Sequence, residues 1–120
     1  MTAARQALGR GVEEQAAAWY VARGFEVVDR NWRCRDGELD LVAAHRRRRL
    51  VVICEVKARR SDRFGTALEA VGVQKQVRLR RLGARWLGER GREVGIRGAT
   101  IRFDVAVWQA GAFSVVENAF

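Results

Sequence analysis

The hydrophobic pattern of this chain begins with a helical period. Apolar residues recur at helical intervals within about residues 10–23, and the set consists of Val12, Ala16, Trp19 and Tyr20. Such spacing places the side chains on one face of a helix, where they pack against a core. Gly24 follows where a C-terminal cap is expected, because glycine adopts the left-handed conformation that ends many helices. The pattern predicts a first helix that ends just before Gly24.

A strand-like pattern follows the first helix. Residues 25–28 form a short apolar run, and the turn signal Asp36-Gly37 leads into residues 38–42, where apolar and polar side chains alternate. The basic segment 45–49 separates this strand from residues 50–57, a longer apolar run with a polar end. A long apolar run is typical of a strand that is buried on both faces. The pattern predicts a hairpin whose turn is the basic segment.

The C-terminal half contains one further helix and two further strands. Apolar residues recur at helical intervals within about residues 66–89, and the set consists of Val73, Val77, Leu82 and Trp86. Residues 101–107 alternate between apolar and polar side chains, and residues 113–116 form a last short strand. The predicted order is α-β-β-β-α-β-β. Because the chain lacks proline and internal repeats, and 120 residues suit one core, a single domain over residues 1–120 is expected.

Charge gives the first indication of function. The chain has 23 Lys and Arg residues against 14 Asp and Glu residues, a formal net charge of +9. Polyanions such as nucleic acids are the natural partners, and the guanidinium groups that supply most of this charge suit phosphate. A GC-rich genome that uses arginine throughout is the alternative explanation of the excess.

Other classes of protein are not indicated. No segment approaches the ~20 apolar residues that cross a bilayer, and the N-terminus lacks the apolar run of a signal peptide. A cytoplasmic protein with no membrane contact is therefore expected. Cys34 and Cys54 lack the spacing of metal ligands and are expected to be reduced thiols.

Candidate chemistry lies at the polar end of the apolar strand. Side chains two residues apart share one face of a strand, so Glu55, Lys57 and Arg59 project together, as do Glu38 and Asp40. If the hairpin brings these faces together, Asp40 and Glu55 form a carboxylate pair beside a lysine. The alternative is an ordinary solvated strand end, with Asp40 paired to one of the many arginines.

A carboxylate pair beside a lysine suits phosphodiester hydrolysis, which needs charge neutralisation and a nucleophilic water. Asp40 and Glu55, with the backbone carbonyl of Val56, are the expected ligands of Mg²⁺ or Mn²⁺, because such ions prefer oxygen donors. Lys57 would orient the attacking water or stabilise the developing charge. The pattern therefore predicts catalytic residues and a metal site at one strand end.

Two segments, residues 37–42 (GELDLV) and 55–59 (EVKAR), resemble the motifs of the PD-(D/E)XK nuclease superfamily. More narrowly, nearly the whole chain is similar to the YraN-like family of uncharacterised bacterial proteins. The resemblance implies a restriction-endonuclease-like core, an α/β fold with a mixed central β-sheet flanked by α-helices. It also implies that Asp40, Glu55 and Lys57 occupy the acid, acid and lysine positions of the motif.

The resemblance adds an acid on the first helix. Glu13 matches a position where superfamily nucleases often place a further metal or water contact, so we include it among the catalytic candidates. The family tends to have glycine immediately before this acid, whereas this chain has Val12. The sequence leaves open whether Glu13 or Glu14 points inward.

A basic stripe follows one face of the second helix. Arg78, Arg81 and Arg85 recur at helical intervals, and Lys75 completes the stripe. These residues and Arg59 are the candidates for binding a nucleic-acid backbone. The alternative is an ordinary solvated helix face.

The residues and the resemblance together predict a metal-dependent endonuclease that acts on DNA in preference to RNA, with branched or flapped DNA among its candidate substrates. A second hypothesis is a non-catalytic module that keeps the nuclease fold and grips nucleic acid. A third is an interaction protein whose basic surface meets an acidic partner. A homodimer would suit an enzyme that cuts two strands, although the sequence shows no self-association pattern.

Overall fold

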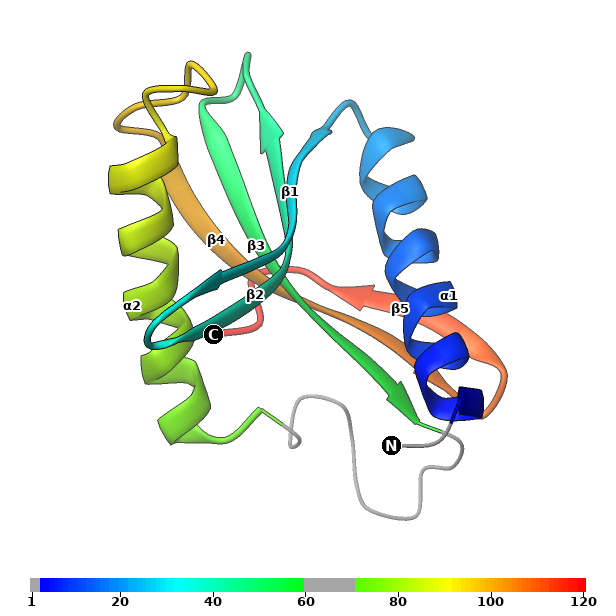
Figure 1. Cartoon of the computed structure of the whole chain (residues 1–120). Coiled ribbons are helices and arrows are strands. Elements are labelled where there is room, and N and C mark those ends of the chain that lie inside the picture. The colour runs from blue at the N-terminus through cyan, green and yellow to red at the C-terminus, as the bar shows by residue number, and fades with distance from the viewer. Residues whose placement is uncertain (1–2, 60–70) are drawn as a thin grey trace.

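The computed structural model describes residues 3–59 and 71–120, and its elements occur in the predicted order (Figure 1). They are helix α1 (Ala3–Val21), strands β1 (Glu26–Cys34), β2 (Gly37–His45) and β3 (Leu50–Arg59), helix α2 (Val73–Arg90), and strands β4 (Thr100–Gln109) and β5 (Ala112–Val116). Gly24 follows α1 with a φ of 88°, as expected of a residue that ends a helix. Within the described ranges no helix is long and apolar enough to cross a membrane.

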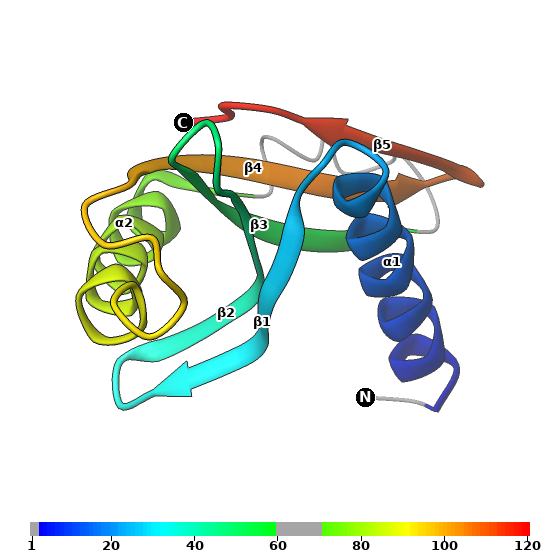
Figure 2. The ribbon, with the colours of Figure 1, turned by 90° about the horizontal axis from the view of Figure 1, so that it is seen from above.

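The five strands form one mixed sheet in the order β1-β2-β3-β4-β5. Neighbouring strands are antiparallel except β3 and β4, which are parallel and are joined through α2. The helices cover opposite faces of the sheet, because Ile53 of β3 packs in the cluster of α2 and the next residue, Cys54, packs in the cluster of α1 (Figure 2). The fold is therefore α/β with a mixed sheet between helices, which confirms the prediction and is compatible with a restriction-endonuclease-like core.

The second helix differs from its prediction in extent and in its buried face. The helix begins at Val73, after Gly72, and residues 66–70 of the predicted span lie outside the described residues. Val73 and Val77 were predicted to face the core, but their exposed fractions are 75% and 44%. The residues that α2 buries are Leu79, Leu82, Gly83 and Trp86. Gly83 allows the helix to pack tightly on the sheet, because a Cβ atom there would lie 3.2 Å from Ile53 and Phe103.

The first strand is longer than its short apolar run predicts. Strand β1 continues to Cys34 through polar residues and pairs with β2 up to Gly37. Its alternation is hidden in the sequence because the register shifts between Val27 and Asp29, and because Asn31 has a φ of 49°. A bulge of this kind bends a strand and increases its twist.

The bent hairpin of β1 and β2 reaches the side of α2 (Figures 1 and 2). At the tip, Arg85 of α2 forms an ion pair with Asp36, and a Cβ atom at Gly37 would lie 3.1 Å from Leu82. Further along, the indole nitrogen of Trp86 donates a hydrogen bond to Asp29 at 2.7 Å. These contacts hold β2 away from the second half of β3, and this separation opens the candidate site.

Candidate active site

The predicted catalytic residues meet at the point where β2 leaves β3. The register of the two strands ends at Leu41 opposite Cys54. Beyond this pair, Oδ2 of Asp40 accepts a hydrogen bond from the backbone nitrogen of Val56 at 2.9 Å. The carboxylate thus satisfies a backbone N–H group that a neighbouring strand would otherwise bind. We call this place, formed by Asp40, Glu55 and Val56, the fork.

Glu55 lies beside two lysines at the fork. Its side chain is 8% exposed, and Lys75 approaches its Oε1 atom to 3.1 Å, whereas Lys57 lies 3.9 Å from the same atom. Lys57 shares a face of β3 with Glu55, and Lys75 comes from the first turn of α2. Strand and helix together therefore neutralise a carboxylate that burial would otherwise penalise.

Asp40 lies close to Glu55, and the two carboxylates oppose one another. Burial raises the pKa of Asp40 to about 7, with the charge of Glu55 as the second cause. The hydrogen bond from Val56 and the charge of Lys75 act in the opposite direction. Two acids that cannot both ionise easily near neutral pH are typical of sites that bind a proton or a cation.

Glu13 is the acid of α1 that points inward. Burial and the charge of Asp40 raise the pKa of Glu13, and a hydrogen bond from Asn31 opposes this shift. Glu14 instead forms an ion pair with Arg30 and has a side chain that is 70% exposed. The question that the sequence left open is therefore decided in favour of Glu13.

The two lysines of the site differ in their affinity for protons. Burial and the neighbouring Lys75 lower the pKa of Lys57. Burial also disfavours the charge of Lys75, but Lys57 and Glu55 outweigh it and raise the pKa of Lys75. Lys57 is thus the amine that gives up its proton first, and Lys75 is the one that keeps its charge.

The donors at the fork fit an oxygen-preferring divalent cation. Within residues 3–59 and 71–120, no three or more His, Cys, Asp or Glu side chains are arranged to hold a metal ion, so Glu13 does not complete a ligand set. Asp40 and Glu55 offer two carboxylates, and the Val56 carbonyl faces the same gap, because N–H and C=O of one strand residue point to the same side. Mg²⁺ is commonly held by one or two carboxylates while waters and substrate oxygens fill its other positions.

The structure divides the predicted basic stripe into two parts. Lys75 lies on the helix face that Leu79 and Leu82 bury, so it reaches Glu55 rather than continuing the stripe. The arginines Arg78, Arg81 and Arg85 line a pocket of about 390 Å³ on the neighbouring face of the helix. The other residues that line this pocket are Asp36, Gln74, Val77 and Leu82. Arg85 is held there by Asp36 and Glu89, each at 3.0 Å. Arg78 and Arg81 have no ion-pair partner in the described part of the chain.

Two residues of the site show how far sequence reasoning reached. The helical spacing of Lys75 to Leu79 and Leu82 places all three on one face, and this signal would have moved Lys75 from the stripe to the site. Asn31, which hydrogen-bonds Glu13, carries no such signal because its orientation depends on the bend of β1. Arg59 ends β3 on the face of Glu55 and is half-buried.

Comparison with known proteins identifies close relatives. A family described as "Uncharacterised protein family UPF0102" matches residues 12–107. A UPF0102 protein of Frankia casuarinae is 49% identical over 102 residues, which cover 85% of this chain and 81% of the relative. A UPF0102 protein of Moorella thermoacetica is 40% identical over 126 residues and covers the whole of both chains. These matches confirm the resemblance to the YraN-like family that the sequence motifs indicated.

Proposed function

Since this chain belongs to the UPF0102 family, we propose that its fork is the active site of a metal-dependent nuclease that hydrolyses phosphodiester bonds. One observation carries the proposal. Two carboxylates, Asp40 and Glu55, lie against one another at a strand end with Lys57 and Lys75 beside them. Two carboxylates this close repel one another, and a divalent cation between them would remove that repulsion.

The residues of the fork would divide the work of the reaction. Asp40, Glu55 and the Val56 carbonyl would hold Mg²⁺ or Mn²⁺, which when bound supplies neutralisation of phosphate charge and a water of lowered pKa. Lys57, whose pKa is lowered, is suited to accept a hydrogen bond or a proton from the attacking water. Lys75 keeps its charge and positions Glu55.

The basic surface supports a nucleic-acid substrate, with DNA expected before RNA. Arg78 and Arg81 present guanidinium groups on the exposed side of the same helix that carries Lys75. A backbone that passed from this pocket to the fork would meet positive charge along one helix, and phosphate contacts of this kind position a strand without reading its sequence. Branched or flapped DNA remains within the proposal, and so does a homodimer that presents two forks to two strands.

The direct test is cleavage of labelled duplex, single-stranded, flapped and four-way DNA, with RNA of the same shapes, in Mg²⁺, Mn²⁺ or chelator. We expect Glu55→Gln to lower the cleavage rate by ~1000-fold or more, which corresponds to about 4 kcal/mol of transition-state stabilisation. Glu14→Gln is the matched control, because it removes the same charge from an exposed site on α1. Cleavage by Glu55→Gln at the rate of the unsubstituted protein would place the activity elsewhere.

A second candidate is a non-catalytic module that binds nucleic acid. It is favoured by Arg78 and Arg81, which form no ion pair within residues 3–59 and 71–120 and need no metal to bind phosphate. Salt-sensitive binding without cleavage in any divalent cation would support it, because each displaced counterion makes the affinity depend on salt. Binding that did not respond to salt would contradict both candidates.

A further inference from the structure

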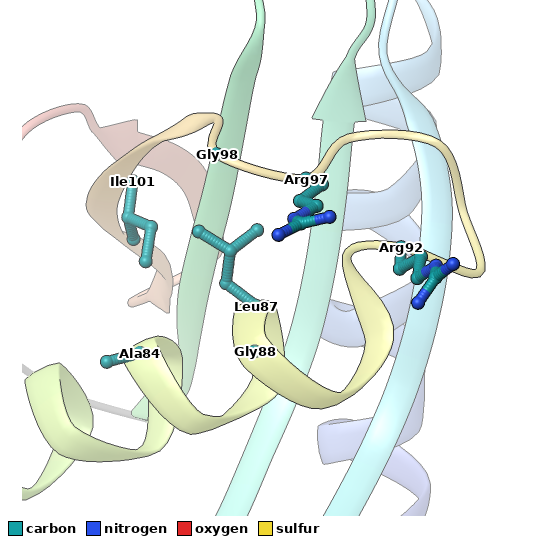
Figure 3. A pocket seen from close by; sticks show the side chains of 7 residues that line it. All are labelled: Ala84, Leu87, Gly88, Arg92, Arg97, Gly98 and Ile101. Atoms are coloured by element: carbon teal, nitrogen blue, oxygen red, sulfur yellow. The ribbon is translucent and has the colours of Figure 1, made fainter.

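A second pocket lies on another face of α2, away from the fork. It is about 550 Å³ in volume and lies between the second half of α2, the segment 91–99 and the start of β4. Figure 3 shows its lining, which consists of Ala84, Leu87, Gly88, Arg92, Arg97, Gly98 and Ile101. A volume of this size is typical of sites for small molecules.

Gly88 leaves the helix side of this pocket open without a packing reason. A Cβ atom at Gly88 would meet nothing within 4 Å, in contrast to Gly83, where one would lie 3.2 Å from Ile53 and Phe103. Glycine inside a helix costs about 1 kcal/mol relative to alanine, so an unneeded glycine is a burden on stability. Because Gly88 has no side chain, the helix surface beside Leu87 is flat. We call this surface the floor of the pocket; a ring can lie on it close to the helix.

The segment opposite this floor is held in place by hydrogen bonds. Arg46 donates to the carbonyl of Val94, and Arg49 donates to the carbonyl of Arg97. The nitrogen of Ile96, a fully buried residue, donates to the carbonyl of Gly91 at 2.8 Å. The basic turn between β2 and β3 therefore shapes this wall in advance, which reduces the entropy lost on binding.

Two arginines line this pocket, and Figure 3 shows the Arg92 side chain pointing away from Leu87 and Ile101. The Arg97 side chain extends between the segment 91–99 and Leu87. Arg92 lies at the end of the pocket away from Ile101 (Figure 3). Neither side chain forms an ion pair within residues 3–59 and 71–120, whereas nearby Arg90 pairs with Asp29 and Glu93. The pocket thus offers an apolar surface and positive charge that the described chain does not neutralise.

We propose that this pocket binds a nucleotide unit, with its base on the floor of Gly88, Leu87 and Ile101 and its phosphate at Arg97 and Arg92. A base has a flat face that suits an apolar floor and a planar guanidinium, and its phosphate matches the charge. The proposal goes beyond the cleavage proposed above, because this binding uses none of the residues of the fork. The unit is either a free nucleotide or an unstacked nucleotide of a strand, which have the same chemistry.

Calorimetry with AMP, adenosine and inorganic phosphate tests this proposal on the full chain. We expect AMP to bind more tightly than adenosine or phosphate, because only AMP uses both halves of the pocket. Gly88→Leu fills the floor and should lower the affinity for AMP at least tenfold, and Arg97→Ala should do the same through the phosphate. Gly11→Leu is the matched control, because Gly11 is also a helical glycine with open space around it.

A labelled single-stranded oligonucleotide separates the two sources of the nucleotide. Loss of oligonucleotide binding in Gly88→Leu, without measurable AMP binding, would support the strand as the source. Equal affinity of both probes for the unsubstituted protein and Gly88→Leu would overturn the proposal, as would a folded protein that binds neither probe. The calorimetry with AMP is done in chelator and requires no cleavage, so failure of cleavage and failure of this pocket are distinguished.

Discussion

Two buried acids lie on adjacent strands and opposite faces of the sheet, and their surroundings differ. Asp104 of β4 has no exposed surface and accepts four hydrogen bonds or ion-pair contacts: from the Tyr20 hydroxyl at 2.6 Å, from Arg102 at 2.9 and 3.0 Å, and from the Asn118 nitrogen at 2.9 Å. This acid is fully satisfied by its own chain.

Glu55 of β3 is in a different position. It faces a second acid, Asp40, and shares one oxygen between two lysines whose pKa values move in opposite directions. Asp104 therefore has a structural role, whereas Asp40 and Glu55 form a site that a further positive charge would stabilise. Burial alone does not separate them, because Glu55 and Asp104 are both buried.

The largest expected effect on this comparison comes from Asp104→Ala. Removing the acid leaves Arg102 and the Tyr20 hydroxyl without their partner, which should lower the free energy of unfolding by ~3 kcal/mol. Glu55→Gln should change the free energy of unfolding by about 1 kcal/mol or less, because the amide keeps a hydrogen-bond acceptor for the lysines. Urea denaturation at neutral pH in chelator measures both. Equal losses of stability would remove the distinction between the two acids.

Asp40→Asn should stabilise the metal-free protein. The pKa of Asp40 is raised from its ordinary value of 3.8 to about 7, so the folded chain binds a proton more tightly than the unfolded chain does. Stability from this group is therefore fully present below about pH 4 and is lost as the pH rises through about 7. At pH 8 the variant should be more stable than the unsubstituted protein by at least ~1 kcal/mol, the free energy of one pKa unit, because the shift exceeds one unit.

The pH dependence provides the check on Asp40. Thermal unfolding in chelator at pH 4, 6 and 8 should show a difference between the two proteins that grows with pH and nearly vanishes at pH 4. Asparagine keeps an oxygen that accepts the hydrogen bond from the Val56 nitrogen, so this contact between the two strands is kept in the variant. Addition of Mg²⁺ should stabilise the unsubstituted protein and leave Asp40→Asn unchanged. A variant that is less stable at pH 8 would contradict the opposition of the two acids.

The smallest expected effect concerns the two lysines. Lys75→Met removes the neighbouring charge that lowers the pKa of Lys57, so the pKa of Lys57 should rise. An NMR titration of the Lys57 side chain measures this directly. Arg81→Met is a suitable control, because Arg81 lies on the same helix and lines the arginine pocket instead of the fork. No change in Lys57 would mean that burial alone sets its pKa.

Much of the fold and the principal site residues could be predicted from the sequence. The order of elements follows from local periodicity, and the pairing of Asp40 with Glu55 follows from the two-residue period of adjacent strands. The inward acid of α1 could not be decided in this way, because Glu13 and Glu14 differ only in how α1 is rotated against the sheet. That rotation depends on the packing of Ala16 and Tyr20 as a set.

The buried face of α2 could not be predicted for a different reason. Val73 and Val77 are apolar and correctly spaced, yet the hairpin tip and the sheet contact the side of the helix marked by Leu79 and Leu82. The choice between two apolar faces is made by the bend of β1 and β2, which starts at a bulge that no local pattern reveals. The same bend separates β2 from β3 and therefore creates the fork.

The tight turn between β2 and β3 acts as an alignment device for the chemistry. His45 opposite Leu50 fixes the register of the hairpin, and four pairs later Leu41 lies opposite Cys54. Because side chains alternate with a period of two, a deletion of one residue in this turn would carry Asp40 to the opposite face from Glu55. Natural length variation in this chain is therefore expected to avoid residues 46–49, even though their arginine side chains are exposed.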